Sequence, residues 1–233
     1  MVLTVHHLGI SQSERIVWLC EALEIKYDLK LYKRAPLLSP PEFKALHPIG
    51  AAPVITDGAI TIAESEACVD YIVNIHGEGK LTIKPGAKNY PDYLYWYYFI
   101  NGTLQPSVSR VMALRSAGVA EDNATRKRYE GKVDQLFSFT DKRLGEVTYF
   151  AGDELTVADI MAVFSLATMR KFIKLDETKY SNITAYLQRI AKLESYQRAM
   201  KKGDPDLVVE ELISPQGPEL IEAMKKPGGI SSK

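Results

Sequence analysis

The feature that most constrains the fold of this 233-residue chain is a short segment around Pro53. Pro53 opens the apolar run Val54–Ile55, and a proline suits the first position of a strand because it lacks a backbone donor. Asp57-Gly58 then predicts a tight hairpin turn between two short strands. A helix follows from Glu64 to His76, where apolar residues recur at helical spacing. The pattern therefore places a strand edge beside the N-terminus of a helix.

This arrangement predicts a site for a small anionic ligand with a peptide backbone. If the Ala52–Pro53 bond is cis, the turn leaves the N–H and C=O of Ala52 free to pair with an extended peptide. Ser65 offers a hydroxyl and a backbone N–H to a carboxylate at the positive end of the helix, and Glu64 can hold an ammonium. A carboxylate and an ammonium on one carbon, followed by a peptide, describe the γ-glutamyl end of glutathione. The alternative is that Pro53 begins a strand and Glu64-Ser65 cap a helix, with no ligand.

The predicted secondary-structure pattern of the chain changes near residue 80. Before it, short strands and helices alternate in the order β-α-β-α-β-β-α, which is the layout of a thioredoxin-like α/β domain. After residue 91 the pattern is all helical, with a long first helix that Gly102 and Pro106 should bend. Strands are expected at 2–6, 27–32, 53–56 and 59–62, and helices at 13–23, 41–46, 64–76, 91–117, 121–144, 156–170 and 180–194. The expected domains are 1–80 (α/β), 81–90 (linker), 91–200 (all-α) and 201–233 (a C-terminal extension).

Composition excludes several classes of protein. The formal net charge is zero, so there is no electrostatic case for binding nucleic acid or an anionic membrane. No apolar run approaches the roughly 18 residues of a membrane span, and the strand at Val2 leaves no room for a signal peptide. Cys20 and Cys68 lie in separate helical patterns without metal-ligand spacing. We therefore expect a soluble, cytoplasmic protein without disulfides, structural zinc or another metal.

Two features of the helical part have mainly structural interpretations. Five tyrosines and a tryptophan crowd residues 90–98, and most should be core, with a minority facing the cleft between domains or a dimer partner. Thr156 and Asp159 have the spacing of a capping box, which stabilises a helix start and is not a catalytic site.

These features occur in a fixed order that resembles the cytosolic glutathione S-transferase family over about residues 1–200. Four segments are similar to serine-type fungal and bacterial members such as yeast glutathione transferase I: residues 8–19, 32–34, 47–50 and 102–106. The resemblance implies a homodimer, a glutathione site on the first domain that includes Ala52, Pro53, Glu64 and Ser65, and an electrophile site between the domains.

The resemblance also implies a catalytic hydroxyl, and Ser11 occupies its place after the first strand. A free thiol has a pKa near 8.5, so lowering it by about two units requires about 2.7 kcal/mol of preference for the thiolate. A hydrogen bond to a charged acceptor supplies about 1.5–3 kcal/mol, and a helix N-terminus adds about 0.3–1 kcal/mol. These magnitudes suffice without a general base. Ser13 is the competing hydroxyl, but it suits the N-cap of the following helix better.

Other candidates remain open at this point. His47, before Pro48, either reaches the glycine carboxylate of glutathione or fills a turn. A number of relatives carry Lys, Gln or Arg where this chain has Ala51, so a basic residue elsewhere must replace that contact. The candidates for this role are Lys33, Arg34, Lys44 and His47. His6 and His7 end the first strand, but no partner pattern in the sequence supports a catalytic role for them.

Three functions compete on this evidence. The first is an enzyme that conjugates glutathione to small hydrophobic electrophiles, with peroxidase activity as a possible addition. The second is a glutathione-dependent oxidoreductase, which would need Cys where Ser11 stands. The third is a non-catalytic or regulatory scaffold on the same fold, which would have no need of Ser11, Glu64 and Ser65.

The extension carries an apolar cluster at 207–213 that should pack on the helical domain, and the chain from Pro227 is expected to be mobile.

Overall fold

The computed structural model describes residues 2–225. Their contacts divide the chain into two compact units. The first unit runs to Ile83 and includes Arg189–Val209, and the second comprises Lys84–Gln188 and continues from Glu210. Each unit is described by itself below.

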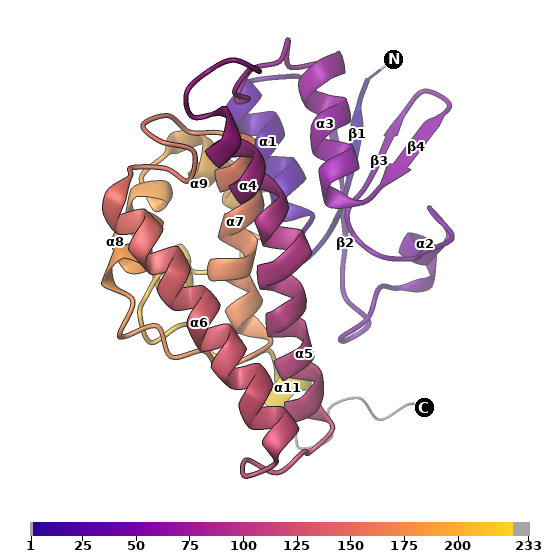
Figure 1. The fold of residues 1–233 in the computed structure, drawn as a ribbon. Coiled ribbons are helices and arrows are strands. Elements are labelled where there is room, and N and C mark those ends of the chain that lie inside the picture. The colour runs from indigo at the N-terminus through magenta and orange to yellow at the C-terminus, as the bar shows by residue number, and fades with distance from the viewer. Residues whose placement is uncertain (1, 226–233) are drawn as a thin grey trace. The chain divides into compact units, whose positions relative to one another are not determined.

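The first unit is built on a four-stranded mixed sheet in the order β2-β1-β3-β4 (Figure 1). The strands are β1 (Thr4–Leu8), β2 (Asp28–Tyr32), β3 (Val54–Asp57) and β4 (Ile60–Ala63). β1 and β2 are parallel, whereas β3 runs antiparallel to both β1 and β4. Helices α1 (Glu14–Leu23) and α3 (Ser65–Ile75) lie on one side of the sheet, and the short α2 (Pro41–Lys44) lies on the other (Figure 1). This confirms the thioredoxin-like layout predicted from the sequence.

Strand β1 contributes side chains to both faces of the sheet, because successive side chains of a strand point to opposite sides. Leu8 points to the side of α2, where it packs with Phe43 and Val54 in a buried cluster. His7, its neighbour, is fully buried. The loop that leaves β1 and enters α1 is therefore anchored on both sides of the sheet.

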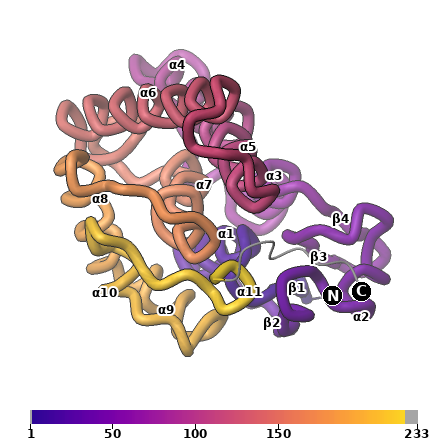
Figure 2. The backbone as a smooth tube through the Cα atoms, turned by 90° about the horizontal axis from the view of Figure 1, so that it is seen from below, coloured from indigo at the N-terminus to yellow at the C-terminus, as the bar shows by residue number. Residues whose placement is uncertain are grey.

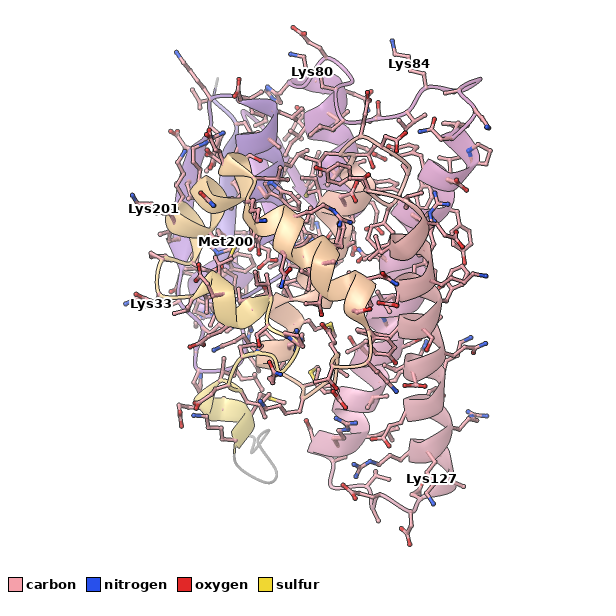
Figure 3. The ribbon with its side chains drawn as sticks, turned by 90° about the vertical axis from the view of Figure 1, so that its left-hand side faces the viewer. Lys33, Lys80, Lys84, Lys127, Met200 and Lys201 are labelled. Atoms are coloured by element: carbon pink, nitrogen blue, oxygen red, sulfur yellow. The ribbon has the colours of Figure 1, made fainter. Side chains whose placement is uncertain are left out.

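A further helix, α9 (Glu194–Gly203), belongs to the first unit and packs along α1. The indole Nε1 of Trp18 donates to Ser195 Oγ at 3.2 Å, and Arg198 Nε donates to a Glu21 carboxylate oxygen at 3.0 Å. Met200 is buried, whereas Lys201 points outward into solvent (Figure 3). The helix predicted at 180–194 is present as α8 (Ser181–Ala191), whereas α9, which begins after Leu193, was not predicted.

The second unit is all helical, as predicted. It contains α4 (Tyr90–Phe99), α5 (Gln105–Ser116), α6 (Ala124–Glu146), α7 (Val157–Leu166), the short 3-10 helix η2 (Thr168–Lys171) and α8. The interruption expected at Gly102 takes the form of a π-helical turn, η1 (Ile100–Leu104), between α4 and α5. The capping box is confirmed, since the Asp159 carboxylate accepts hydrogen bonds from the backbone N–H groups of Thr156 and Phe150, both at 3.0 Å. Full burial raises the pKa of Asp159 to about 6.

The last described segment carries the short helices α10 (Val209–Leu212) and α11 (Glu222–Lys225) (Figure 2). From Glu210 it belongs to the second unit, where Ile221 N donates to Lys171 O at 2.9 Å. The prediction that residues 205–215 pack on the helical domain is therefore right only from Glu210, since the chain up to Val209 groups with the first unit. The apolar cluster also divides, with Leu212 buried and Val208 exposed. The prediction of mobility from Pro227 falls outside the described residues.

Candidate functional site

Ser11 lies in the turn between β1 and α1, and only 4% of its surface is exposed. Its hydroxyl oxygen lies 2.7 Å from that of Ser13 and also accepts the backbone N–H of Ser13 at 3.2 Å. Its backbone carbonyl accepts Glu14 N at 3.0 Å, which holds the turn against the first residue of α1. The hydroxyl predicted to be catalytic is thus fixed beside the positive end of a helix.

Ser13 does not cap α1 with its side chain, which corrects the role inferred from the sequence. It occupies the N-cap position, but its backbone is already helical, with φ −69° and ψ −13°. Its hydroxyl instead accepts Leu8 N at 3.1 Å and lies 2.9 Å from His7 Nδ1. Ser13 is completely buried and faces the sheet.

The Ala52–Pro53 peptide bond is cis. The carbonyl oxygen of Ala52 was expected to be free. In the structure it accepts a hydrogen bond from Gln12 Nε2 at 2.9 Å. Gln12 follows Ser11 directly, so this hydrogen bond ties the turn before α1 to the loop before β3. Two of the predicted site segments are therefore joined.

Arg15 links the third segment to the other two. This side chain is fully buried, and its Nη1 donates to Gln12 Oε1 at 3.0 Å and to Ser65 Oγ at 3.3 Å. A hydrogen-bonded chain thus runs from Ala52 through Gln12 and Arg15 to Ser65 (Ala52–Ser65 chain hereafter). Ser65 is the first residue of α3, where the helix dipole favours an anion.

Glu64, just before α3, has an unusual backbone. Its φ is +75° and its ψ is 130°, although it is neither glycine nor asparagine. Such a conformation costs on the order of 1–3 kcal/mol and is found most often at functional sites. The side chain of Glu64 is exposed, so burial does not explain why a glutamate occupies this position.

The basic residues considered for the glycine carboxylate differ in their surroundings. His47 is partly exposed, and its Nδ1 accepts Ile49 N in a long contact of 3.4 Å. Arg34 is committed to the turn after β1, since it donates to the carbonyl oxygens of Gly9 and Ile10, and to that of Leu37. Burial lowers the pKa of Arg34. Lys33 and Lys44 complete the set, and Lys44 is exposed on α2.

Comparison with known proteins identifies the family. The model described as "Glutathione S-transferase, N-terminal domain" matches residues 1–74, and the one described as "Glutathione S-transferase, C-terminal domain" matches residues 100–194. A crystal structure of a glutathione S-transferase from Actinobacillus pleuropneumoniae is 30% identical, with a TM-score of 0.79, and the match covers 87% of this chain and 93% of that one. The chain belongs to the glutathione S-transferase family.

Two curated fungal relatives agree with the resemblance drawn from the motifs. Glutathione S-transferase 3 of Schizosaccharomyces pombe is 28% identical over 214 residues, covering 86% of this chain and 88% of that one. Glutathione S-transferase 1 of Saccharomyces cerevisiae is 26% identical over 224 residues, covering 86% and 95%. The predicted family and its enzymatic class are confirmed, and this glutathione S-transferase is an enzyme.

Neither cysteine of this glutathione S-transferase suits a nucleophilic role. Cys20 and Cys68 are both free and buried. Burial raises the pKa of Cys68 to about 12 and raises that of Cys20 as well, so both remain thiols at neutral pH. Among residues 2–225, no helix is both long enough and apolar enough to cross a membrane.

The sequence analysis set His7 aside because the sequence showed no partner for it, but the structure supplies one. Its Nε2 lies 2.9 Å from Asp204 Oδ2, and both side chains are buried. The partner stands just after α9, in a part of the chain that was expected to be an extension beyond the fold. His6, by contrast, faces the other side of the sheet, where it contacts Tyr32 and Thr56. Burial, together with Lys30, lowers the pKa of His6.

Proposed function

We propose that this glutathione S-transferase binds glutathione on its first unit and transfers it, as the Ser11-stabilised thiolate, to small hydrophobic electrophiles. The observation that carries the proposal is the Ala52–Ser65 chain, which joins the loop before β3 and the N-terminus of α3 to Gln12, the residue that follows Ser11. In this proposal Ser65 and the α3 N-terminus hold the γ-glutamyl carboxylate, and Glu64 holds the ammonium. Pro53 and His47 complete the predicted contacts along the peptide.

The Ser11 hydroxyl donates a hydrogen bond to the sulfur and stabilises the thiolate. This requires about 2.7 kcal/mol for a two-unit fall in the thiol pKa, which one charge-assisted hydrogen bond and a helix N-terminus can supply. The thiolate then attacks the electrophilic carbon. The same thiolate, attacking the terminal oxygen of an organic hydroperoxide, would break the O–O bond, release the alcohol and leave a sulfenic acid, which a second glutathione thiol converts to the disulfide and water; this would provide the peroxidase side activity.

Retention on immobilised glutathione tests the ligand site. The double variant Glu64→Gln/Ser65→Ala should no longer be retained, while its thermal midpoint stays close to that of the parent. A matched pair on α6, Ser138→Ala/Glu146→Gln, makes the same chemical changes at exposed positions of the second unit and should be retained normally. Equal retention of both double variants would refute the site.

Turnover with an aryl halide tests the thiolate. Ser11→Ala should lower kcat by about ten- to a thousandfold, which corresponds to about 1.4–4 kcal/mol of transition-state stabilisation. Ser11→Thr keeps the hydroxyl and should retain most of the activity. Glutathione affinity should change far less than kcat in both variants, since the hydroxyl contacts the sulfur and not the ends of the tripeptide.

We also propose a homodimer. Three aromatic side chains of the second unit are unusually exposed: Tyr95 (51%), Tyr98 (54%) and Phe139 (44%). They line one hollow between α4 and α6, and exposed apolar surface of this kind marks an interaction site. Sedimentation at micromolar concentration should give twice the 26.1 kDa of the chain. Tyr98→Lys should shift the equilibrium to the monomer, and a monomeric parent protein would refute the dimer.

The proposed compartment is the cytoplasm, in keeping with two free thiols.

A further inference from the structure

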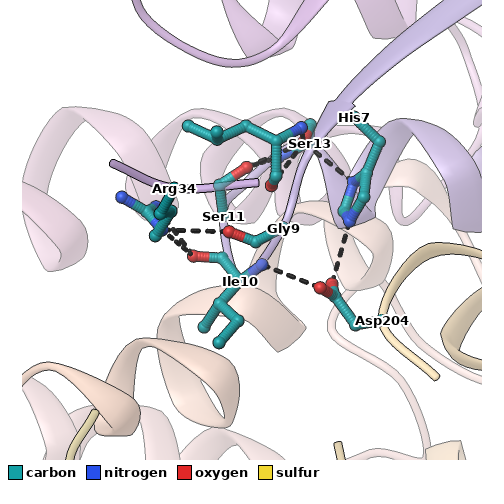
Figure 4. Close-up of polar contacts among 8 residues, drawn as sticks. His7, Gly9, Ile10, Ser11, Ser13, Arg34 and Asp204 are labelled. Carbon is teal, nitrogen blue, oxygen red and sulfur yellow. Dashed lines mark hydrogen bonds and ion pairs between the residues drawn. The ribbon is translucent and has the colours of Figure 1, made fainter. Parts of the chain in front are cut away.

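Four buried side chains of the first unit form an unbroken hydrogen-bonded line that starts at Ser11 (Figure 4). The Ser11 and Ser13 hydroxyl oxygens lie 2.7 Å apart, and Ser13 Oγ lies 2.9 Å from His7 Nδ1. The other ring nitrogen of His7, Nε2, lies 2.9 Å from Asp204 Oδ2. A hydroxyl placed to touch substrate is therefore connected to a buried histidine–aspartate pair, which the function proposed above does not use.

The surrounding structure holds this line (Ser11–Asp204 line hereafter) in place. The second carboxylate oxygen of Asp204 accepts Ile10 N at 2.8 Å. Gly203 lies against the imidazole, and a Cβ there would come within 3.2 Å of Nε2. Charged and titratable groups that act on Asp204 include His7, Arg34 from the segment after β2, and the buried phenol of Tyr196 from α9.

Counting hydrogen atoms fixes the direction of the bonds. An ionised Asp204 requires a hydrogen on Nε2, which leaves Nδ1 of a neutral His7 as an acceptor. Ser13 Oγ accepts Leu8 N at 3.1 Å, and two acceptors compete for its own hydrogen: His7 Nδ1 at 2.9 Å and Leu8 O at 3.4 Å. The shorter distance assigns this hydrogen to Nδ1. The hydrogen of Ser11 then goes to Ser13. Ser11 Oγ also accepts Ser13 N, and its remaining lone pair can accept a hydrogen from a thiol.

We propose that His7 receives the proton of the glutathione thiol through Ser11 and Ser13. The thiol proton moves to Ser11 Oγ, the Ser11 proton moves to Ser13 Oγ, and the Ser13 proton moves to His7 Nδ1. One S–H and two O–H bonds break, while two O–H bonds and one N–H bond form. The products are a thiolate that accepts a hydrogen bond from Ser11 and an imidazolium held between Ser13 and Asp204.

This inference rests on the proposed function, since it needs glutathione with its sulfur at Ser11. It replaces the earlier expectation that no base is required: Ser11 stabilises the thiolate, and the buried pair takes up the proton. His7, Ser13 and Asp204 are positioning residues in this scheme, because they act on the substrate only through Ser11.

Counting the protons released on binding tests the line. At about pH 7.5 a free thiol is mostly protonated and an ordinary imidazole is mostly neutral. Glutathione binding is measured by calorimetry in buffers of different ionisation enthalpy, and bound thiolate by its ultraviolet absorbance. In the wild-type protein the thiol proton should stay on His7, so less than about half a proton should reach the buffer for each thiolate formed. S-methylglutathione, which has no thiol proton, gives the baseline.

Two variants interrupt the line at different points. His7→Gln keeps an amide donor toward Asp204 but loses the base, so each thiolate should release about one proton and form at higher pH. Asp204→Asn donates an amide hydrogen to Nε2, which moves the ring hydrogen to Nδ1 and leaves His7 with no room for another proton. It should therefore also release about one proton per thiolate, although Ser11 remains free to donate to sulfur.

His6→Gln is the matched control, because it removes an imidazole from the adjacent position of β1 on the opposite face of the sheet. It should behave like the wild-type protein. About one released proton per thiolate in the wild-type protein, or wild-type behaviour in both interrupted variants with intact thermal midpoints, would overturn the line alone. Bound glutathione without any thiolate absorbance would overturn the proposed function as well.

Discussion

The guanidinium Nη1 of Arg170 lies 2.9 Å from the Glu177 carboxylate, and both side chains are 1% exposed. For a buried ion pair of this kind, the effect on stability depends on whether one partner is removed or both are replaced. Removing one partner leaves an uncompensated charge in the interior, whereas replacing both with apolar groups is often neutral. Within the described residues, Arg170 Nε and Glu177 Oε1 have no hydrogen-bond partner, so the pair does not recover its full cost of desolvation.

We therefore expect Glu177→Leu to lower the free energy of unfolding by about 3–5 kcal/mol. The double variant Arg170→Met/Glu177→Leu should recover most of that loss, because no charge remains buried. Denaturant unfolding of the parent, the two single variants and the double variant completes the cycle. Losses that simply add up would show that the pair is not coupled.

Gly217 tests how the last segment is held on the second unit. Arg170 Nη2 donates to Pro215 O at 2.9 Å, and a Cβ on Gly217 would approach Nη2 to 2.5 Å. The φ of Gly217 is +72°, and Gly118 in the same unit has a φ of +69° with open space around it. Gly217→Ala and Gly118→Ala thus share the backbone strain, and only the first adds a clash. Gly217→Ala should be the more destabilising of the two and should expose residues 214–221 to limited proteolysis. Equal effects would mean that strain alone matters.

The backbone of Glu64 allows a test of whether its strain lowers stability while its carboxylate serves glutathione binding. Glu64→Gly relaxes a backbone held at φ +75°, and this relief of about 1–3 kcal/mol exceeds the entropic cost of a new glycine, about 0.5–1 kcal/mol. The variant should therefore melt at or above the temperature of the parent while binding glutathione more weakly. Glu64→Ala removes the same carboxylate but keeps the strain, so it should lose affinity without gaining stability. A lower melting temperature for Glu64→Gly than for Glu64→Ala would contradict this account.

The order of elements in the first unit was predictable because each element has a local signal. Strand β3 begins at Val54, one residue after the predicted start at Pro53, and the predicted hairpin turn at Asp57-Gly58 lies between β3 and β4. The Thr156–Asp159 box was predictable for the same reason, since a cap depends on residues three apart.

The missed parts depend on residues that are distant in sequence. His7 and Asp204 are 197 positions apart, and no local sequence pattern around either residue indicates that the two are in contact. A signal for α9 did exist: Tyr196, Ala199, Met200 and Gly203 recur at helical spacing, and all four are buried. What the pattern could not show is that this face packs on α1 and so brings Asp204 to the turn that holds Ser11.

The final prediction concerns acid stability and the hairpin turn of the first unit. Asp57, at the end of β3, accepts hydrogen bonds from His76 Nε2 at 2.8 Å and from Tyr71 Oη at 3.0 Å. These two donors, His76 first, hold the pKa of Asp57 below its usual value. A carboxyl group with a lowered pKa in the folded state binds a proton more tightly when the chain is unfolded. Its contribution to stability is therefore complete above the unfolded pKa of about 3.9 and disappears as the pH falls through the folded value.

Asp57→Asn should accordingly lower the thermal midpoint at neutral pH, and the gap between variant and parent should close as the pH falls below about 4. Asp122→Asn, at an exposed position of the second unit, serves as the control for loss of one negative charge. Thermal melts of the three proteins across this range measure the two gaps. If the Asp57→Asn gap were the same at every pH, the variant would be acting through the geometry of the turn and not through the charge of the carboxylate.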